Sequence, residues 1–148
     1  MEKMQKMNYV PQILFYGTIR SELASSCLSK VFNIPISNIF TEETPQGVDF
    51  DRILTEGYFI LYTFPEGNLN VRADGFISSN LFTEQNLLNL STCSERLICV
   101  DHSESDENKR FDSYYNRKQS KNVMVRIIDT ENDEFLYQLE GAESFLSS

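Results

Sequence analysis

The residues of this sequence best suited to acid–base chemistry are Asp101 and His102. His102 is the single histidine, and the pair follows an apolar run that ends at Val100, where a strand would open into a polar loop. Neighbouring residues on an extended chain point to opposite faces, and no nucleophile stands at a diagnostic spacing from them. We therefore do not expect this pair to be catalytic.

The acidic segment 101–107 superficially resembles a calcium-binding loop, because oxygen-bearing side chains alternate along it. An EF-hand loop needs glycine at its sixth position and glutamate at its twelfth. Counted from Asp101, those positions hold Asp106 and Asp112. The sequence also lacks a P-loop, a GxGxxG motif and a GxSxG motif. We expect a solvated acidic loop, no metal ion and no cofactor.

Acidic residues outnumber basic ones by 22 to 13, which gives a formal net charge of −9. This balance disfavours binding to nucleic acid or to an anionic membrane, since both need a surplus of Lys and Arg. It is compatible with a basic protein partner, and also with plain solubility alone. The acids gather in three segments: Glu42, Glu43, Asp49, Asp51 and Glu56; Asp101, Glu104, Asp106 and Glu107; and Asp129, Glu131, Asp133 and Glu134. They form either one acidic patch or three separately solvated turns.

Cys27, Cys93 and Cys99 show no CxxC spacing. Cys27 falls on the apolar face of an expected helix and Cys99 within an apolar strand, so buried free thiols in a reducing compartment are expected. No apolar run approaches the length of a membrane span, and the first residues lack the apolar core of a signal peptide. We expect a cytoplasmic protein.

The elements that would position these residues follow from hydrophobic spacing. An amphipathic stripe predicts a helix over residues 21–32, and Thr83 can cap a second helix with Glu84 in its first turn. Strands are expected at 13–16, 58–64, 69–77, 97–100, 123–128 and 135–139, with a further short one near Ile36 to Phe40. In the strand 69–77 the polar residues Asn70, Arg72 and Asp74 would share the face opposite the buried residues.

The order of these elements predicts an α+β fold in a single domain of residues 1–148. We expect a mainly antiparallel sheet of about five to six strands, with two helices packed on one face. Residues 1–8 are expected to be frayed, and 102–120 to form a long polar loop.

Residues 15–20 read Phe-Tyr-Gly-Thr-Ile-Arg, and this segment resembles the strand-turn signature of the gamma-glutamylcyclotransferase-like family. The resemblance implies that the Tyr16-Gly17-Thr18 turn would bind a glutamyl group through its backbone, with a glutamate elsewhere as general base. Glu56 is the nearest candidate for that base. A small enzyme of this kind is the alternative interpretation of the chain.

The chain as a whole is similar in size, acidity and element order to bacterial toxin-immunity proteins, including those of contact-dependent growth inhibition systems. The resemblance implies a non-catalytic inhibitor that binds and neutralises a basic toxin domain, a nuclease. Carboxylates would then meet the Lys and Arg groups of the toxin, and Tyr114 or Tyr115 would supply an anchor. The expected partner-binding residues are Glu42, Glu43, Asp49, Asp51, Asp101, Glu104, Asp106 and Glu107.

Overall fold

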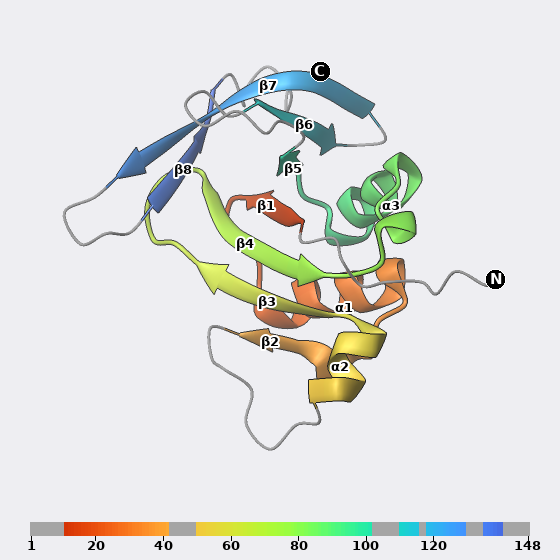
Figure 1. Ribbon diagram of the computed structural model, residues 1–148. Helices are drawn as coiled ribbons and strands as arrows, with labels where there is room; N and C mark the ends of the chain where they lie inside the picture. Colours follow the sequence, from red (N-terminus) through yellow and green to blue (C-terminus); the bar gives the residue numbers. More distant parts are fainter. Residues whose placement is uncertain (1–10, 42–49, 102–109, 116–117, 130–134, 141–148) are drawn as a thin grey trace.

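The computed structural model describes residues 11–41, 50–101, 110–115, 118–129 and 135–140. Across these residues the strands form one sheet in the order β2-β3-β4-β1-β5-β6-β7-β8 (Figure 1). The strands are β1 (Gln12–Tyr16), β2 (Ile39–Thr41), β3 (Tyr58–Thr63), β4 (Leu69–Phe76), β5 (Ile98–Asp101), β6 (Arg110–Tyr115), β7 (Lys118–Asp129) and β8 (Phe135–Leu139). The helices are α1 (Ser21–Phe32), α2 (Phe50–Glu56) and α3 (Glu84–Ser94), with short 3₁₀ turns η1 (Ile36–Asn38) and η2 (Ser79–Leu81).

The α+β class is confirmed, and the sheet is larger than expected. Eight strands are present in the described residues where five to six were predicted. Each neighbouring pair is antiparallel except β2–β3, which is parallel. The parallel pair arises because the chain passes through α2 between β2 and β3 and so re-enters the sheet in the same direction.

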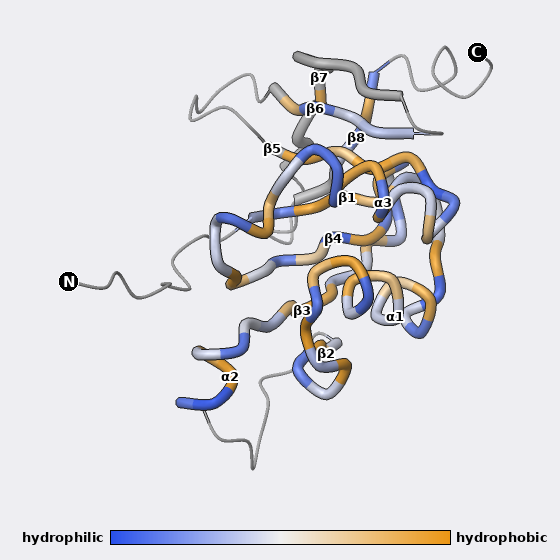
Figure 2. Tube along the Cα trace, turned by 90° about the vertical axis from the view of Figure 1, so that its right-hand side faces the viewer, coloured by the Kyte–Doolittle hydropathy of each residue, from blue (hydrophilic) through white to orange (hydrophobic). Residues whose placement is uncertain are grey.

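Helices α1 and α3 cover the same face of the sheet, as predicted (Figure 2). Helix α1 buries one stripe of its surface and ends at Asn33, which adopts the left-handed conformation. Helix α3 begins at Thr83, whose hydroxyl accepts the Asn86 backbone N–H at 3.1 Å. Together they close the helix-side core, which includes Ile13, Phe15, Ala24, Cys27, Leu28, Phe32, Phe59, Leu61, Val71, Ala73, Leu87, Leu90, Ile98, Val100 and Tyr114.

The sheet curls so that β8 returns to the start of β4. The side-chain amide of Asn68 donates to the Leu139 carbonyl at 3.0 Å, and its oxygen accepts the Leu139 N–H at 2.6 Å. Gly67 permits the approach, since a Cβ there would lie 2.5 Å from the Tyr137 carbonyl oxygen. The curl encloses a second core of Leu14, Leu69, Leu97, Cys99, Phe111, Val125, Tyr137 and Leu139.

The prediction of one long polar loop over 102–120 is wrong, because β6 and the start of β7 lie within it. In β6 the buried Phe111 belongs to the second core and the buried Tyr114 to the helix-side core. The two residues are three positions apart, so they point to opposite sides of the strand. Because its buried aromatics are divided between the two sides, β6 lacks the one-sided apolar alternation by which a strand is predicted from sequence. Residues 1–8, expected to be frayed, and residues 102–109, expected to belong to the polar loop, lie outside the described residues.

Candidate functional site

The side of β3 and β4 that faces away from α1 and α3 is partly exposed to solvent (Figure 1). On β3 the residues Tyr58, Ile60 and Tyr62 alternate with the buried Phe59 and Leu61. The parallel register sets Phe40 of β2 beside Ile60 and therefore on the same side. We name this surface the open face, and it comprises Phe40, Tyr58, Ile60, Tyr62, Phe64, Asn70, Arg72, Asp74 and Phe76.

Strand pairing arranges the open face in cross-strand pairs. Tyr58 lies opposite Phe76, and their rings stack with centroids 5.6 Å apart. Tyr62 lies opposite Arg72. Aromatic pairs at such positions stabilise a sheet beyond the area that they bury. The face is therefore a preformed surface with fixed side chains.

Arg72 lies at the end of the open face that adjoins β8. Its Nε donates to Asp74 Oδ1 at 2.8 Å and its Nη2 to Asp74 Oδ2 at 3.0 Å, which makes a bidentate pair. Its Nη1 donates to the Tyr137 hydroxyl at 2.8 Å. The guanidinium carbon lies 4.8 Å from the centroid of the Tyr62 ring and 5.5 Å from that of Phe64. Only 18% of the Arg72 side chain and 25% of the Asp74 side chain are exposed, so the ion pair is shielded from water.

The surroundings of the pair shift the pKa of both partners. Burial alone would lower the pKa of Arg72, but the Tyr137 hydroxyl and the Asp74 carboxylate outweigh it and leave that pKa raised. Burial raises the pKa of Asp74, and the attraction of Arg72 offsets only part of the effect. Near neutral pH the pair is ionised, so it contributes no net charge to the open face.

This combination of residues is typical of a protein-binding surface. Aromatic and arginine side chains are enriched at the centres of protein interfaces, and they contribute most of the binding energy there. Rigid rings lose little conformational entropy when a partner docks. The open face can thus bury apolar area against another protein while the Arg72–Asp74 pair offers it polar contacts.

The predicted partner-binding acids are mostly outside the described residues. Glu42, Glu43, Asp49, Glu104, Asp106 and Glu107 lie there. Asp51 is exposed in the first turn of α2, and Asp101 is the last residue of β5. Strand β5 is three positions from β3 in the sheet, a separation of about 14 Å at ordinary strand spacing. Helix α2 leads directly into β3. Asp51, on the helix that precedes β3, and Asp101, on β5, therefore lie at separate places along the sheet.

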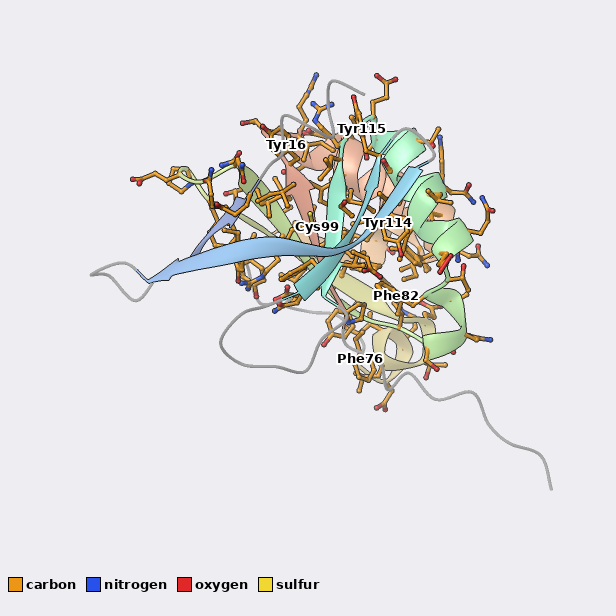
Figure 3. All side chains as sticks on the ribbon, turned by 90° about the horizontal axis from the view of Figure 1, so that it is seen from above. Tyr16, Phe76, Phe82, Cys99, Tyr114 and Tyr115 are labelled. Carbon is orange, nitrogen blue, oxygen red and sulfur yellow. The ribbon has the colours of Figure 1, made fainter. Side chains whose placement is uncertain are left out.

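The predicted anchor Tyr114 is only 2% exposed and packs in the helix-side core, pointing toward α3 (Figure 3). It cannot therefore serve as a surface anchor. Tyr115 is partly buried against the second core. His102 lies outside the described residues. In the part of the chain that the structure describes, no group of three or more potential ligands is placed to hold a metal ion. No helix among those residues is long and apolar enough to cross a bilayer.

The Tyr16-Gly17-Thr18 turn has the strand-to-helix geometry that its sequence suggested. Gly17 has a φ of +77°, and its N–H donates to the Asn68 carbonyl at 2.8 Å. The Thr18 carbonyl accepts a hydrogen bond from Arg96 Nη2 at 3.1 Å. The turn therefore uses part of its backbone to join the neighbouring hairpin.

Glu56 lies far from that turn. Tyr16 pairs with Leu69 at the start of β4, whereas Tyr58, two residues after Glu56, pairs with Phe76 at its end. Seven residues of extended strand separate these levels by roughly 23 Å. Glu56 instead accepts hydrogen bonds from Arg52 at 2.6 Å and from Asn38 at 3.0 Å. It cannot act as a base on a group held at Gly17.

Comparisons of the chain with protein-family models, curated proteins and solved structures found no match. The functional interpretation therefore depends on the chain's own residues. The sequence carried one signal for the open face: the alternation that placed Asn70, Arg72 and Asp74 on one side of a strand also runs through Tyr58, Ile60 and Tyr62.

Proposed function

We propose that this protein is a non-catalytic, protein-binding inhibitor of the cytoplasm, an immunity protein that binds and neutralises a basic toxin domain of the nuclease type. The observation that carries the proposal is the open face. It is a row of partly exposed aromatic residues around a shielded Arg72–Asp74 pair. Helices α1 and α3 pack on the opposite side of the sheet.

The open face supplies the anchoring energy in this proposal. Side chains that are already packed and hydrogen-bonded need little ordering on binding, so more of the contact energy becomes affinity. Partly exposed rings such as Tyr62 and Phe76 can insert into pockets of a partner. The bidentate contact with Asp74 leaves further N–H groups of Arg72 for carbonyl oxygens of the partner.

The net charge of −9 supports a basic partner. A negative field raises the rate at which a cationic protein encounters this one, without requiring each acid to touch it. Strand β2, at the edge of the sheet, bears Phe40 of the open face. In sequence it is followed at once by Glu42 and Glu43. We therefore propose that the acids guide the toxin and the aromatic residues hold it.

The test begins with affinity capture from the native organism, followed by co-expression with each captured basic protein. Rescue of growth from a toxic captured protein identifies the partner. The variant Ile60→Lys then places a positive charge on the open face, and Leu23→Lys places the same charge on the exposed surface of α1. We expect Ile60→Lys to weaken binding by about 30-fold or more and Leu23→Lys to leave it nearly unchanged.

Equal affinity of both lysine variants for the toxin would refute binding through the open face. The role of charge is measured separately, because steering raises the association rate and is screened by salt. An association rate that stays constant between low and high ionic strength would refute electrostatic guidance while leaving the open face intact.

A further inference from the structure

The helix layer brings two cysteines together. Cys27 of α1 is fully buried, and Cys93 of α3 is partly exposed. Both pack in the helix-side core, where α1 and α3 lie against each other. The Cys27 thiol is hydrogen-bonded to Cys93, so the two side chains are direct neighbours. Cys99 belongs instead to the second core, on the opposite side of the sheet.

We propose that Cys27 and Cys93 form a reversible redox pair, in which a low-molecular-weight disulfide such as oxidised glutathione converts the two thiols into a bond between α1 and α3. The partly exposed Cys93 gives the oxidant access, and the buried Cys27 beside it is the resolving thiol. This site is separate from the open face, which lies on the other side of the sheet.

The reaction balances in two exchange steps. The Cys93 thiolate attacks one sulfur of the oxidant, forming a mixed disulfide and releasing one glutathione thiolate. The sulfur of Cys27, losing its proton, then attacks the Cys93 sulfur and releases the second glutathione thiolate. The two protons lost by the cysteines end on the two released thiols. The oxidant gains the two electrons that the protein loses.

The second step depends on the environment of Cys27. Burial and the hydrogen bond to Cys93 raise the pKa of Cys27 to about 12. Because only the thiolate attacks, ring closure slows by about tenfold for each unit by which the pH lies below that value. The pair is therefore a slow responder near neutral pH, which suits a sensor of sustained oxidation.

The experiment uses the full chain, purified reduced and incubated with oxidised glutathione at about pH 8.5, where exchange is faster. The readouts are intact mass, peptide mapping without reductant, and thermal unfolding. We expect the wild type to lose the mass of two hydrogen atoms and to yield one linked peptide pair containing Cys27 and Cys93. The bond closes a loop of about 65 residues, so the melting temperature should rise by about 5–10 °C and fall back on reduction.

Two variants separate this pair from other thiol chemistry. Cys99→Ala removes a buried cysteine of the second core and should still form the bond. Cys27→Ala should stop at the mixed disulfide, with glutathione retained on Cys93. If a variant does not fold, the linked peptide pair of the wild type tests the proposal alone. A stable glutathione adduct, a bond involving Cys99, a dimer linked through Cys93, or no reaction after prolonged exposure to diamide would each overturn the proposal.

Discussion

Arg72 illustrates at the residue scale how a charged side chain can occupy an aromatic surface. Three of its N–H groups are bonded within the protein, and rings of three residues surround its guanidinium. The position of Arg72 on a half-buried strand was predictable from alternation in the sequence. Its contact with Tyr137 was not, because the two residues are 65 positions apart and meet only when the sheet curls.

Replacing Arg72 with methionine should destabilise the protein. Methionine keeps much of the side-chain volume but leaves the largely buried Asp74 carboxylate and the Tyr137 hydroxyl without their partner. We expect a loss of about 2–3 kcal/mol in the free energy of unfolding, measured by urea denaturation. The matched control is Arg20→Met, because the Arg20–Glu22 contact is long, at 3.9 Å, and highly exposed. An equal effect of both substitutions would contradict the importance of the shielded pair.

The pH dependence of Asp74 has a definite sign. Burial raises its pKa in the folded protein above 3.8, its value in an unfolded chain. A raised folded-state pKa adds stability that is fully present below 3.8 and is lost as pH rises through the folded value. The free energy of unfolding of the wild type minus that of Asp74→Asn should therefore fall as pH rises from about 3.8 toward neutral and then level off. Urea titrations across that range measure it, and a difference that grows with pH would refute the assignment.

At the scale of elements, local signals predicted the helices of the helix layer well. The apolar stripe of residues 21–32 coincides with α1, and the Thr83 cap coincides with the start of α3. Strand β6 was missed because its two buried aromatics, Phe111 and Tyr114, belong to different cores. The open face was foreseen only as the polar side of one strand, since its aromatic half requires the pairing of β3 with both β2 and β4. The predicted acidic site falls mainly outside the described residues.

The cap of α3 gives a prediction for a single element. Thr83→Ala removes the hydroxyl that accepts the Asn86 N–H, so it should cost about 1 kcal/mol of unfolding free energy. Thr92→Ala is the control, because Thr92 is exposed in the same helix, where alanine has the higher helix propensity. Thermal unfolding followed by circular dichroism should show a lower melting temperature for the first variant alone. A similar decrease in both would indicate that the cap contributes little.

At the scale of the whole molecule, the sheet is closed by a small number of contacts between β8 and the residues before β4. Asn68 provides two of them through its side chain and a third through its backbone N–H, which donates to the Tyr137 carbonyl at 3.2 Å. Tyr137 also contacts Phe64, with ring centroids 5.5 Å apart in an edge arrangement. The closure therefore connects the second core to the open face.

Asn68→Ala should loosen this closure. The variant loses two side-chain hydrogen bonds to Leu139, and we expect a decrease of about 1–3 kcal/mol in unfolding free energy. Amide hydrogen exchange should speed up in β8 more than in β1. Asn89→Ala is the control, because Asn89 is exposed on α3 and accepts a hydrogen bond from Gln85 of the same helix. Unchanged exchange in β8 would show that the curl does not depend on Asn68.

The long span of the Asn68 contacts also has a consequence for synthesis. Asn68 and Leu139 are 71 residues apart, so the ribosome makes the receiving edge of β4 long before the strand that closes it. In that interval β1, β3 and β4 can pair, but the second core lacks β7 and β8 and presents apolar surface. Nascent chains stalled before Phe135 should therefore engage chaperones more strongly than chains stalled well beyond Leu139.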